Sequence, residues 1–395
     1  MAGRFGLLLT IVVAATSNGR AVPTPKDYAL RVIDKILEVE SQAKGVFLSW
    51  DYGGGIIFDA MHRASTSLGH PELLITLDKY LDDMTSDPDS YGYKILHNIR
   101  IPFYRAVGDQ VPLFTIAYLN RYLRQRNASD LMIVNTAAQK YLLPYPYYLA
   151  DGTFSRHEGW GTEPDRNASF VWADDQYMAL TLLCRIAKAF DRVDYANLAV
   201  KFAGQYAGYL FDTTDGLSFH GYNDADHKNA PCKWGRANGW GMMTHVEILE
   251  AMDHFPALRE SESFKRQLRL LQQHSAGLRH VQSKPDGRWH QVIDEASTFL
   301  ETSATAMFVS SMIRAVKKGW LDRDYVGPVI FGAWEGLRKT IGEDGRVDGI
   351  SCGTGIGTNA SFYNGQSTEY VISQPGLGSV IHALVDLNDL FESSE

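Results

Sequence analysis

The sequence predicts an all-α protein in which pairs of helices close into a ring, an α/α toroid. About thirteen segments of the 395-residue chain carry apolar residues at spacings of three and four, the pattern of amphipathic helices. The runs that resemble strands, such as 217–222 and 288–293, are short and lie between helices. The sequence has no fixed repeat period, which an α-solenoid would show, so the pattern favours a closed ring.

The predicted helices follow one another after residue 21 without a linker, a block of charge or a low-complexity stretch. The range 193–210 is the clearest, because Leu198, Phe202 and Tyr206 fall on one apolar stripe. We therefore expect residues 22–395 to form a single domain. In chain order the predicted helices are 26–43, 53–69, 72–84, 93–107, 109–124, 129–141, 173–190, 193–210, 237–254, 258–279, 300–318, 323–341 and 369–391.

Residues 1–21 have the features of a secretory signal peptide. Arg4 supplies a positive charge, an apolar run follows from Leu7 to Ala15, and a small-residue cleavage site ends at Ala21. The run is too short to span a bilayer, and no later stretch has the pattern of a transmembrane helix. The sequence thus predicts a secreted, extracellular protein that does not sit in a membrane.

Three N-x-S sequons, at Asn127, Asn167 and Asn359, agree with a secreted glycoprotein. The net charge of −8 argues against binding to nucleic acid, although a small anion held by one local arginine stays compatible. Aromatic residues make up 12% of the chain, which suits a sugar-binding cleft and equally suits a large core.

The chain has three cysteines, so at most one disulfide can form within it. Cys232 and Cys352 are the expected pair because both lie in loop-like segments, whereas Cys184 lies in an apolar run and is expected to be a buried thiol. Neither a CxxC nor an HExxH pattern is present, and we expect no metal and no other cofactor.

Four segments at loop-to-helix junctions concentrate the residues that could carry chemistry. Their aromatic, glycine and charged residues are hard to explain by helix propensity alone. The segments are SRHEGWG with His157, FVWADDQYM with Trp172, Asp174 and Asp175, DGLSFHGYN with His220, and KWGRANGWGMM with Trp234, Arg236 and Trp240.

The paired aspartates at the start of the predicted helix 173–190 have two interpretations. Aspartate is a common helix cap, because its side chain accepts hydrogen bonds from free backbone N–H groups. One cap needs only one aspartate, however, and Trp172 with Tyr177 would form an apolar wall that raises a carboxyl pKa, as a general acid requires. The helix N-terminus lowers that pKa, so the balance stays open.

The other candidates also have a structural alternative. His157 and His220 follow D-G turns and so lie on loops where ligands bind, but a lone histidine is more often structural. Arg236 offers a planar fork for a carboxylate, and Trp234 offers a flat face for a sugar ring. Equally, Trp234 could be a core anchor and Arg236 part of an ion pair.

In this order the motifs resemble the unsaturated glycuronyl hydrolases of glycoside hydrolase family 105 and its relative, family 88. The resemblance covers residues 151–380 and implies an (α/α)6 barrel with a pocket at one end. The matching motifs are DGTFSRH (151–157), W-x-D-D-x-Y-M (172–178), D-G-L-x-x-H (215–220), W-G-R-x-N-G-W (234–240), DGRWHQVID (286–294), LETSATAMF (300–308) and CGTGIG (352–357) before SFYNG (361–365).

The resemblance implies an enzyme that removes a 4,5-unsaturated uronic acid from short oligosaccharides made by polysaccharide lyases. Asp174 would be the general acid and base that hydrates the C4=C5 enol-ether bond. We expect an unsaturated galacturonyl group on rhamnose as the first substrate, with glucuronyl substrates as the alternative. The residues expected to hold the sugar are His157, Trp172, Asp175, His220, Trp234 and Arg236, with Arg236 on the uronate carboxylate and Tyr363 at the outer rim.

One departure from the family pattern concerns an upstream aspartate that faces the pocket. The corresponding stretch here is SYGYKILHN (90–98), before AVGDQ (106–110), and it contains no aspartate; Asp87 and Asp89 align poorly. A polar group of the pocket has therefore moved or been replaced, which leaves the sugar specificity open.

Two other functions remain as alternatives. An inverting glycosidase on the same barrel needs a second carboxylate, for which Glu163, Asp224 and Glu301 are candidates. The other alternative is an inactive, secreted sugar-binding protein, although the presence of Asp174 with Arg236 argues against it.

Overall fold

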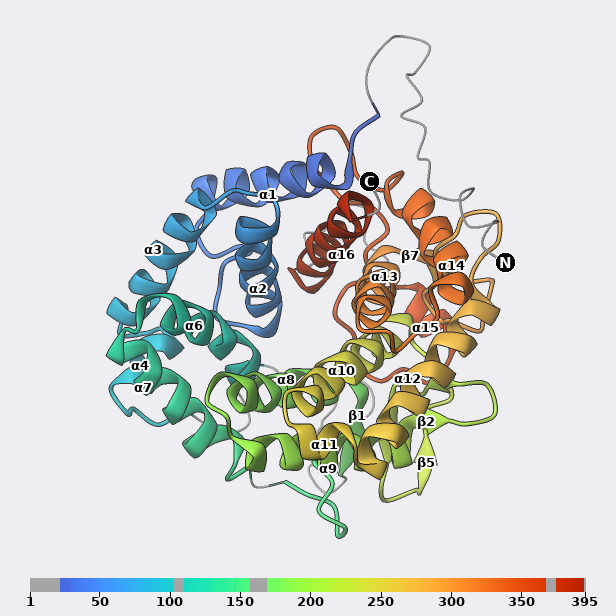
Figure 1. The fold of residues 1–395 in the computed structure, drawn as a ribbon, viewed down its shortest axis with the longest axis horizontal. Coiled ribbons are helices and arrows are strands. Elements are labelled where there is room, and N and C mark those ends of the chain that lie inside the picture. The colour runs from blue at the N-terminus through green and yellow to red at the C-terminus, as the bar shows by residue number, and fades with distance from the viewer. Residues whose placement is uncertain (1–21, 102–109, 146, 157–168, 367–373, 394–395) are drawn as a thin grey trace.

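The computed structural model describes residues 22–101, 110–145, 147–156, 169–366 and 374–393, and it is dominated by helices arranged as a ring (Figure 1). The helices are α1 (Pro25–Gln42), α2 (Tyr52–Ser67), α3 (Glu72–Ser86), α4 (Tyr91–Leu96), α6 (Val111–Gln125), α7 (Ala128–Thr136), the π-helix η1 (Ala137–Leu142), α8 (Ala173–Ala189), α9 (Val193–Leu210), α10 (Gly235–Asp253), α11 (Pro256–Arg259), α12 (Glu262–Val281), α13 (Thr302–Lys317), α14 (Arg323–Leu337), α15 (Ala360–Asn364) and α16 (Gln374–Glu392).

Six helices form an inner ring, and six form an outer layer (Figure 1). In the inner ring α2, α6, α8, α10, α13 and α16 each pack against the next, and α16 returns to α2. Outside them, α3 packs on α2, α7 on α6, α9 on α8, α12 on α10, α14 on α13 and α1 on α16. This is an (α/α)6 barrel, and it confirms the predicted fold class.

The glycines of the KWGRANGWGMM segment serve the packing of the inner ring. α10 is buried along nearly its whole length, so it must approach its neighbours closely on every side. A Cβ atom at Gly239 would collide with the sulfur of Met307 on α13, and one at Gly241 would lie 3.0 Å from His274 on α12. The cost of glycine in a helix is therefore offset by close contacts between helices.

Most predicted helices are confirmed within a few residues, and two differ. The range 258–279 is interrupted, because Ser261 caps α12 by accepting a hydrogen bond from the Phe264 N–H at 3.1 Å, so α11 and α12 are separate. Of the range 93–107, residues 93–96 belong to α4, residues 97–101 are not helical, and residues 102–109 lie outside the described part of the chain.

Short strands lie at the N-terminal ends of the inner helices. They form three small antiparallel sheets, in the orders β1-β4-β5, β2-β3 and β6-β7. The predicted strand-like run 217–222 contains β3 and most of β4, and the run 288–293 contains β6, whereas β1, β2, β5 and β7 lie outside both runs. The strands are β1 (Phe170–Trp172), β2 (Phe211–Asp212), β3 (Leu217–Ser218), β4 (Gly221–Asn223), β5 (Lys228–Asn229), β6 (Trp289–His290) and β7 (Leu300–Glu301).

Charged side chains connect the inner helices toward their C-terminal ends, and we call this group the charged belt. Arg185 contacts Glu247 at 2.8 Å, Arg314 contacts Glu247 at 2.8 Å, and Arg63 contacts Asp386 at 2.6 Å. These contacts show that the inner helices run parallel. The belt comprises Asp59, Arg63, Asn120, Arg185, Lys188, Glu247, Glu250, Ser310, Arg314, His382 and Asp386, with at least one residue from each inner helix.

Within the described residues, none of the helices combines the length and the apolar character that a bilayer crossing requires. The predicted signal peptide, residues 1–21, lies outside the described part of the chain.

Candidate active site

Asp174 lies in the first turn of α8, at the end of the barrel where the inner helices begin. Its Oδ1 accepts a hydrogen bond from Trp240 Nε1 at 3.1 Å, and its Oδ2 lies 3.2 Å from His220 Nε2. The Asp174 side chain is 17% exposed, whereas both of its partners are fully buried. The two buried partners therefore hold the Asp174 carboxylate in place, and a ligand can still reach its exposed part.

The pairing of β1 with β4 brings Asp174 and His220 together. Trp172 stands opposite Gly221, and the next residue, Ala173, donates its N–H to the His220 carbonyl at 3.0 Å. Asp174 follows directly in the first helical turn, so its side chain projects beside the imidazole of His220. The loop-to-helix junction of FVWADDQYM is thus fixed by a sheet.

A chain of hydrogen bonds orients the His220 ring. Tyr363 Oη lies 2.7 Å from His220 Nδ1, and the Gly357 N–H donates to the same Oη at 2.8 Å. Burial raises the pKa of Tyr363, so its hydroxyl stays protonated and can donate to Nδ1. The arrangement that satisfies all these groups leaves the proton on Nε2, directed at Asp174.

The pKa of Asp174 reflects opposing influences. Burial acts to raise it, whereas the hydrogen bond and the electrostatic influence of the His220 ring lower it. The positive charges of Arg156 and Arg236 lower it further, and the net pKa lies below the ordinary value. The ligand-free protein therefore holds Asp174 as a carboxylate at neutral pH, which decides the balance that the sequence left open.

Asp175 points away from the site. It is fully buried and accepts hydrogen bonds from Arg156 Nε at 2.7 and 2.9 Å, in a bidentate ion pair. The guanidinium of Arg156 lies 4.9 Å from the ring of Trp172, which is 8% exposed. The prediction that Asp175 contacts substrate is wrong, because its carboxylate is committed to holding the β1 segment.

The two tryptophans of KWGRANGWGMM have roles that the sequence did not reveal. Trp234 is 1% exposed, lies 4.5 Å from the His220 ring and donates to Gln291 Oε1 at 3.2 Å, which contradicts the predicted open face for a sugar. Trp240, from the same predicted segment, stacks on Tyr177 at 5.3 Å and donates to Asp174. Its buried N–H needed an acceptor, and that was the signal for its role.

Arg236 is 1% exposed and only partly satisfied. Its Nε donates to Ser303 Oγ at 3.0 Å and its Nη2 to the Ser351 carbonyl, but its Nη1 has no hydrogen-bond partner among the described residues. Glu301 lies 3.8 Å away, and its oxygens accept from the N–H groups of Ser303 at 3.1 Å and Ser351 at 2.9 Å. A free N–H group of a buried arginine is suited to an anionic ligand.

A family model described as "Glycosyl Hydrolase Family 88" matches residues 28–391. The chain belongs to glycosyl hydrolase family 88. It is therefore a glycosidase, and Asp174 lies within the matched region. The resemblance to families 105 and 88 that the motifs indicated is confirmed.

Relatives of this family 88 hydrolase agree with the assignment. The chain is 25% identical over 342 residues to the unsaturated rhamnogalacturonyl hydrolase YesR of Bacillus subtilis, covering 84% of this chain and 87% of the relative. It is 30% identical over 187 residues to the unsaturated 3S-rhamnoglycuronyl hydrolase of Alteromonas sp., covering 46% and 44%.

Solved structures show the same fold. A possible family 105 member from Klebsiella pneumoniae superposes with a TM-score of 0.78 at 20% identity, covering 97% of this chain and 98% of that one. A possible family 105 member from Salmonella enterica gives a TM-score of 0.73 at 22% identity, covering 96% and 88%.

The remaining predicted residues of the family 88 hydrolase have mixed outcomes. Tyr363 is fully buried behind His220, which contradicts its predicted place at the outer rim. Cys232 and Cys352 are both free thiols, so the expected pair does not form, whereas Cys184 is buried as expected. His157, Glu163 and Asn167 lie outside the described residues.

Two sequons begin helices on the surface. Asn127 and Asn359 are exposed and cap α7 and α15, each accepting a backbone hydrogen bond through its side-chain oxygen. A glycan on the side-chain nitrogen would leave both caps intact.

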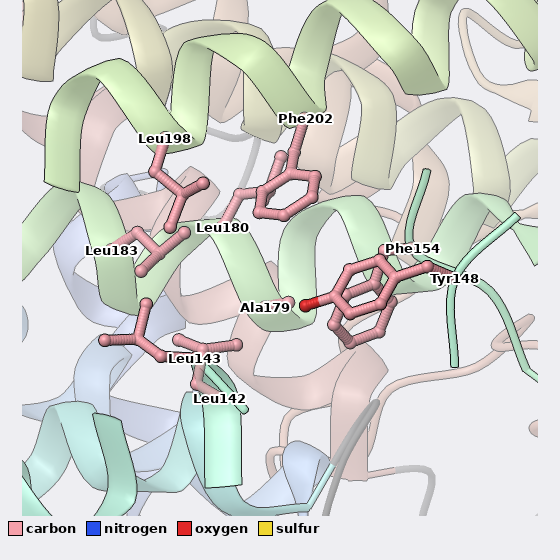
Figure 2. A pocket seen from close by; sticks show the side chains of 9 residues that line it. All are labelled: Leu142, Leu143, Tyr148, Phe154, Ala179, Leu180, Leu183, Leu198 and Phe202. Atoms are coloured by element: carbon pink, nitrogen blue, oxygen red, sulfur yellow. The ribbon is translucent and has the colours of Figure 1, made fainter. Parts of the chain in front are cut away.

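Figure 2 shows a cavity of about 70 Å³ that lies apart from Asp174. Its lining comes from α8, α9, η1 and the 148–154 segment, and the hydroxyl of Tyr148 is the one polar side-chain group in it. The lining lacks a carboxylate, an imidazole or a cationic side chain, so it offers no acid–base chemistry. In the described residues, no cluster of three or more His, Cys, Asp or Glu side chains could hold a metal ion.

Proposed function

We propose that this hydrolase removes a 4,5-unsaturated uronic acid from the non-reducing end of oligosaccharides made by polysaccharide lyases. The observation that carries the proposal is an accessible carboxylate, Asp174, held by Trp240 and His220 at the end of the barrel where the inner helices begin. The names of the relatives, which include rhamnogalacturonyl and rhamnoglycuronyl hydrolases, support the same substrate class.

Neither Asp175 nor Glu301 is suited to be the second carboxylate for direct displacement at the glycosidic carbon. That chemistry needs two carboxyl groups on opposite sides of the scissile bond. Asp175 is paired with Arg156, and Glu301 is fully buried and caps α13, so neither is free. A single carboxyl group suffices for hydration of a double bond, because it can act first as an acid and then as a base.

The proposed reaction begins when protonated Asp174 delivers its proton to C4 of the enol ether. Positive charge then develops at C5 and the ring oxygen, and water adds at C5 while the Asp174 carboxylate takes its proton. The product is a hemiketal at C5, which opens. The glycosidic bond then collapses, releasing the remaining saccharide with its hydroxyl group restored. Asp174 ends the cycle protonated, as it began.

Arg236 links substrate binding to the protonation of Asp174. In the free protein the Arg236 charge is one of the influences that lower the Asp174 pKa. A uronate carboxylate paired with the free Nη1 would neutralise that influence, and the bound sugar would also exclude water from Asp174. Both effects raise the pKa of Asp174, so the substrate itself favours the acid form that the first step needs.

The substrate that we propose first is an unsaturated galacturonyl group on rhamnose, from rhamnogalacturonan, with unsaturated glucuronyl oligosaccharides as the alternative. We also propose that the protein is secreted, since residues 1–21 have the pattern of a signal peptide. A polysaccharide fragment outside the cell is a suitable substrate for a secreted enzyme.

The test is the ultraviolet absorbance of the conjugated double bond in lyase-generated oligosaccharides. We expect the absorbance to fall when the purified protein is added to rhamnogalacturonan or glucuronan fragments, with release of the saturated saccharide. The Asp174→Asn variant should leave the absorbance unchanged. Cleavage of a saturated glycoside with no effect on unsaturated ones would refute the proposal and favour an inverting glycosidase.

A further inference from the structure

Gln110 carries a buried acceptor that the protein itself does not satisfy. It occupies the N-cap position of α6, yet its side chain makes no capping hydrogen bond. Its Oε1 is buried and has no hydrogen-bond partner in the described structure. A buried acceptor without a donor lowers stability, so such a group in a folded protein calls for an explanation.

Trp50 packs against α6 one helical turn after Gln110, and it carries a buried donor without a partner among the described residues. Its ring stacks on Phe114 with the centroids 4.6 Å apart and the planes 29° apart. Phe114 is four residues after Gln110, so the two share one face of the first turns of α6, and Trp50 covers that face. The Trp50 Nε1 is buried without a partner, so a donor and an acceptor lie unused on one wall.

This wall belongs to the end of the barrel that holds Asp174. Trp50 precedes α2, Gln110 precedes α6, and these helices are followed around the ring by α8 and α10. Trp172, at the start of α8, and Arg236, in the first turn of α10, also carry buried donors without partners. Four adjacent inner helices therefore present three unused donors and one unused acceptor around the same end.

We propose that Gln110 is a specificity-determining residue whose Oε1 accepts a hydrogen bond from a ring hydroxyl of the bound uronide. This inference rests on the proposed function. A lyase product keeps its C2 and C3 hydroxyls, and each hydroxyl can donate to Gln110 and accept from Trp50 Nε1. The carboxylate of the sugar would pair with Arg236, and one of its hydroxyls would pair with Gln110 and Trp50. The sugar would thus supply the missing partners of all three residues.

The neutral amide suits an anionic sugar. The stretch 90–98, where the sequence led us to look for an aspartate, forms α4 and contains none. An amide oxygen accepts a hydroxyl hydrogen bond without placing a second negative charge near the uronate. Gln110 thus supplies an uncharged acceptor at this end of the barrel, where the expected aspartate is absent.

The test compares Gln110→Met, which removes the acceptor and keeps the side-chain length, with Gln125→Met as the matched control. Gln125 lies at the other end of the same helix and is exposed. The substrates are a nitrophenyl unsaturated uronide and its 2-deoxy and 3-deoxy analogues. For Gln110→Met we expect about a tenfold loss of kcat/KM on the parent substrate, the size of one hydrogen bond. On the analogue that lacks the partner hydroxyl, we expect no loss relative to wild type.

The melting temperature separates this role from a structural one. Because Gln110 Oε1 has no partner among the described residues, Gln110→Met should leave Tm unchanged or raise it relative to wild type, whereas Gln125→Met loses the hydrogen bond from Gln125 to Asp78. An equal loss on all three substrates, no loss on the parent, or a Tm well below that of the wild type would overturn the inference. If the wild-type protein leaves every unsaturated uronide intact, the proposed function fails and this inference fails with it.

Discussion

His220 Nε2 lies 3.2 Å from Asp174 Oδ2, although 46 residues separate the two in the chain. The contact exists because β1 and β4 pair with Trp172 opposite Gly221. Tyr363, which lies 143 residues further along the chain from His220, orients the imidazole from its other side. The surroundings of the proposed acid–base group, Asp174, are therefore assembled from three distant segments, and each can be tested separately.

Replacement of Asp174 by Asn should abolish turnover while the fold is kept. The amide has the same shape, but it cannot deliver a proton to C4 or take one from water. We expect kcat to fall by about 10²–10⁴-fold or more, the usual contribution of a general acid or base. The measurement is steady-state loss of double-bond absorbance, with circular dichroism to confirm folding. Substantial residual activity would remove Asp174 from the mechanism.

Replacement of the adjacent Asp175 by Asn should mainly lower the stability of the fold, whereas the Asp174 replacement should mainly lower turnover. The change removes the charged partner of Arg156 from a buried ion pair. We expect a loss of about 3 kcal/mol in the free energy of unfolding, as for other buried pairs with one partner removed. Urea unfolding measures this loss. If Asp175→Asn is as stable as wild type, the assignment of Asp175 to a structural role is wrong.

Tyr363→Phe should change the behaviour of His220. Loss of the hydroxyl removes the donor to Nδ1 and leaves the Gly357 N–H without its acceptor, so the proton is free to shift from Nε2. We expect about a tenfold lower kcat and an altered pH profile of kcat/KM, with about 1 kcal/mol lower stability. The exposed Tyr325→Phe is the control. A lower stability with an unaltered pH profile would contradict the orienting role.

Trp240→Phe should raise the pKa of Asp174. The indole N–H stabilises the carboxylate form, so its removal favours the protonated acid, while the phenyl ring keeps the stacking on Tyr177. Free enzyme with protonated Asp174 is the active form, so kcat/KM falls as the pH rises through this pKa. We expect that descending limb to move to higher pH in the variant. A limb that stays in place or moves to lower pH would show that the hydrogen bond does not control Asp174.

The charged belt predicts how stability depends on pH. Burial acts to raise the pKa of Asp59, but Arg185 and other positive groups lower it from 3.8 to about 2. A lowered pKa in the folded state gives stability that is present above the unfolded value near 4 and is lost as the pH falls toward 2.

For Asp59 this contribution is about 2 kcal/mol, and Glu250, with a pKa of about 2, should add to the same loss. Unfolding free energies measured between pH 5 and pH 2 should therefore fall steeply, on the scale of these shifts. Asp59→Asn should be less stable at neutral pH, because Arg185 loses a partner, and less sensitive to acid. An equal slope in wild type and variant would exclude Asp59 from the acid response.

Local patterns in the sequence anticipated most of the helices and the position of Asp174. Apolar spacing reports one face of a helix wherever neighbours bury that face, so α1, α2 and α9 agree closely with their predicted ranges. The break between α11 and α12 was missed because one serine cap outweighed a continuous apolar pattern. The apolar spacing in the range 258–279 is equally compatible with a single helix.

The sequence by itself determined the all-α ring, the order of its motifs and, through them, the family, and it singled out Asp174 as the proposed acid–base group. Only the tertiary structure decided which side chains are open, because exposure depends on helices that are distant in the chain. Trp234 and Tyr363 are buried by partners that no local pattern names, and Arg63 finds Asp386 323 residues away. Closing the ring brings residues that are distant in the chain into contact. Asp175 is buried in its ion pair with Arg156, whereas the neighbouring Asp174 stays accessible.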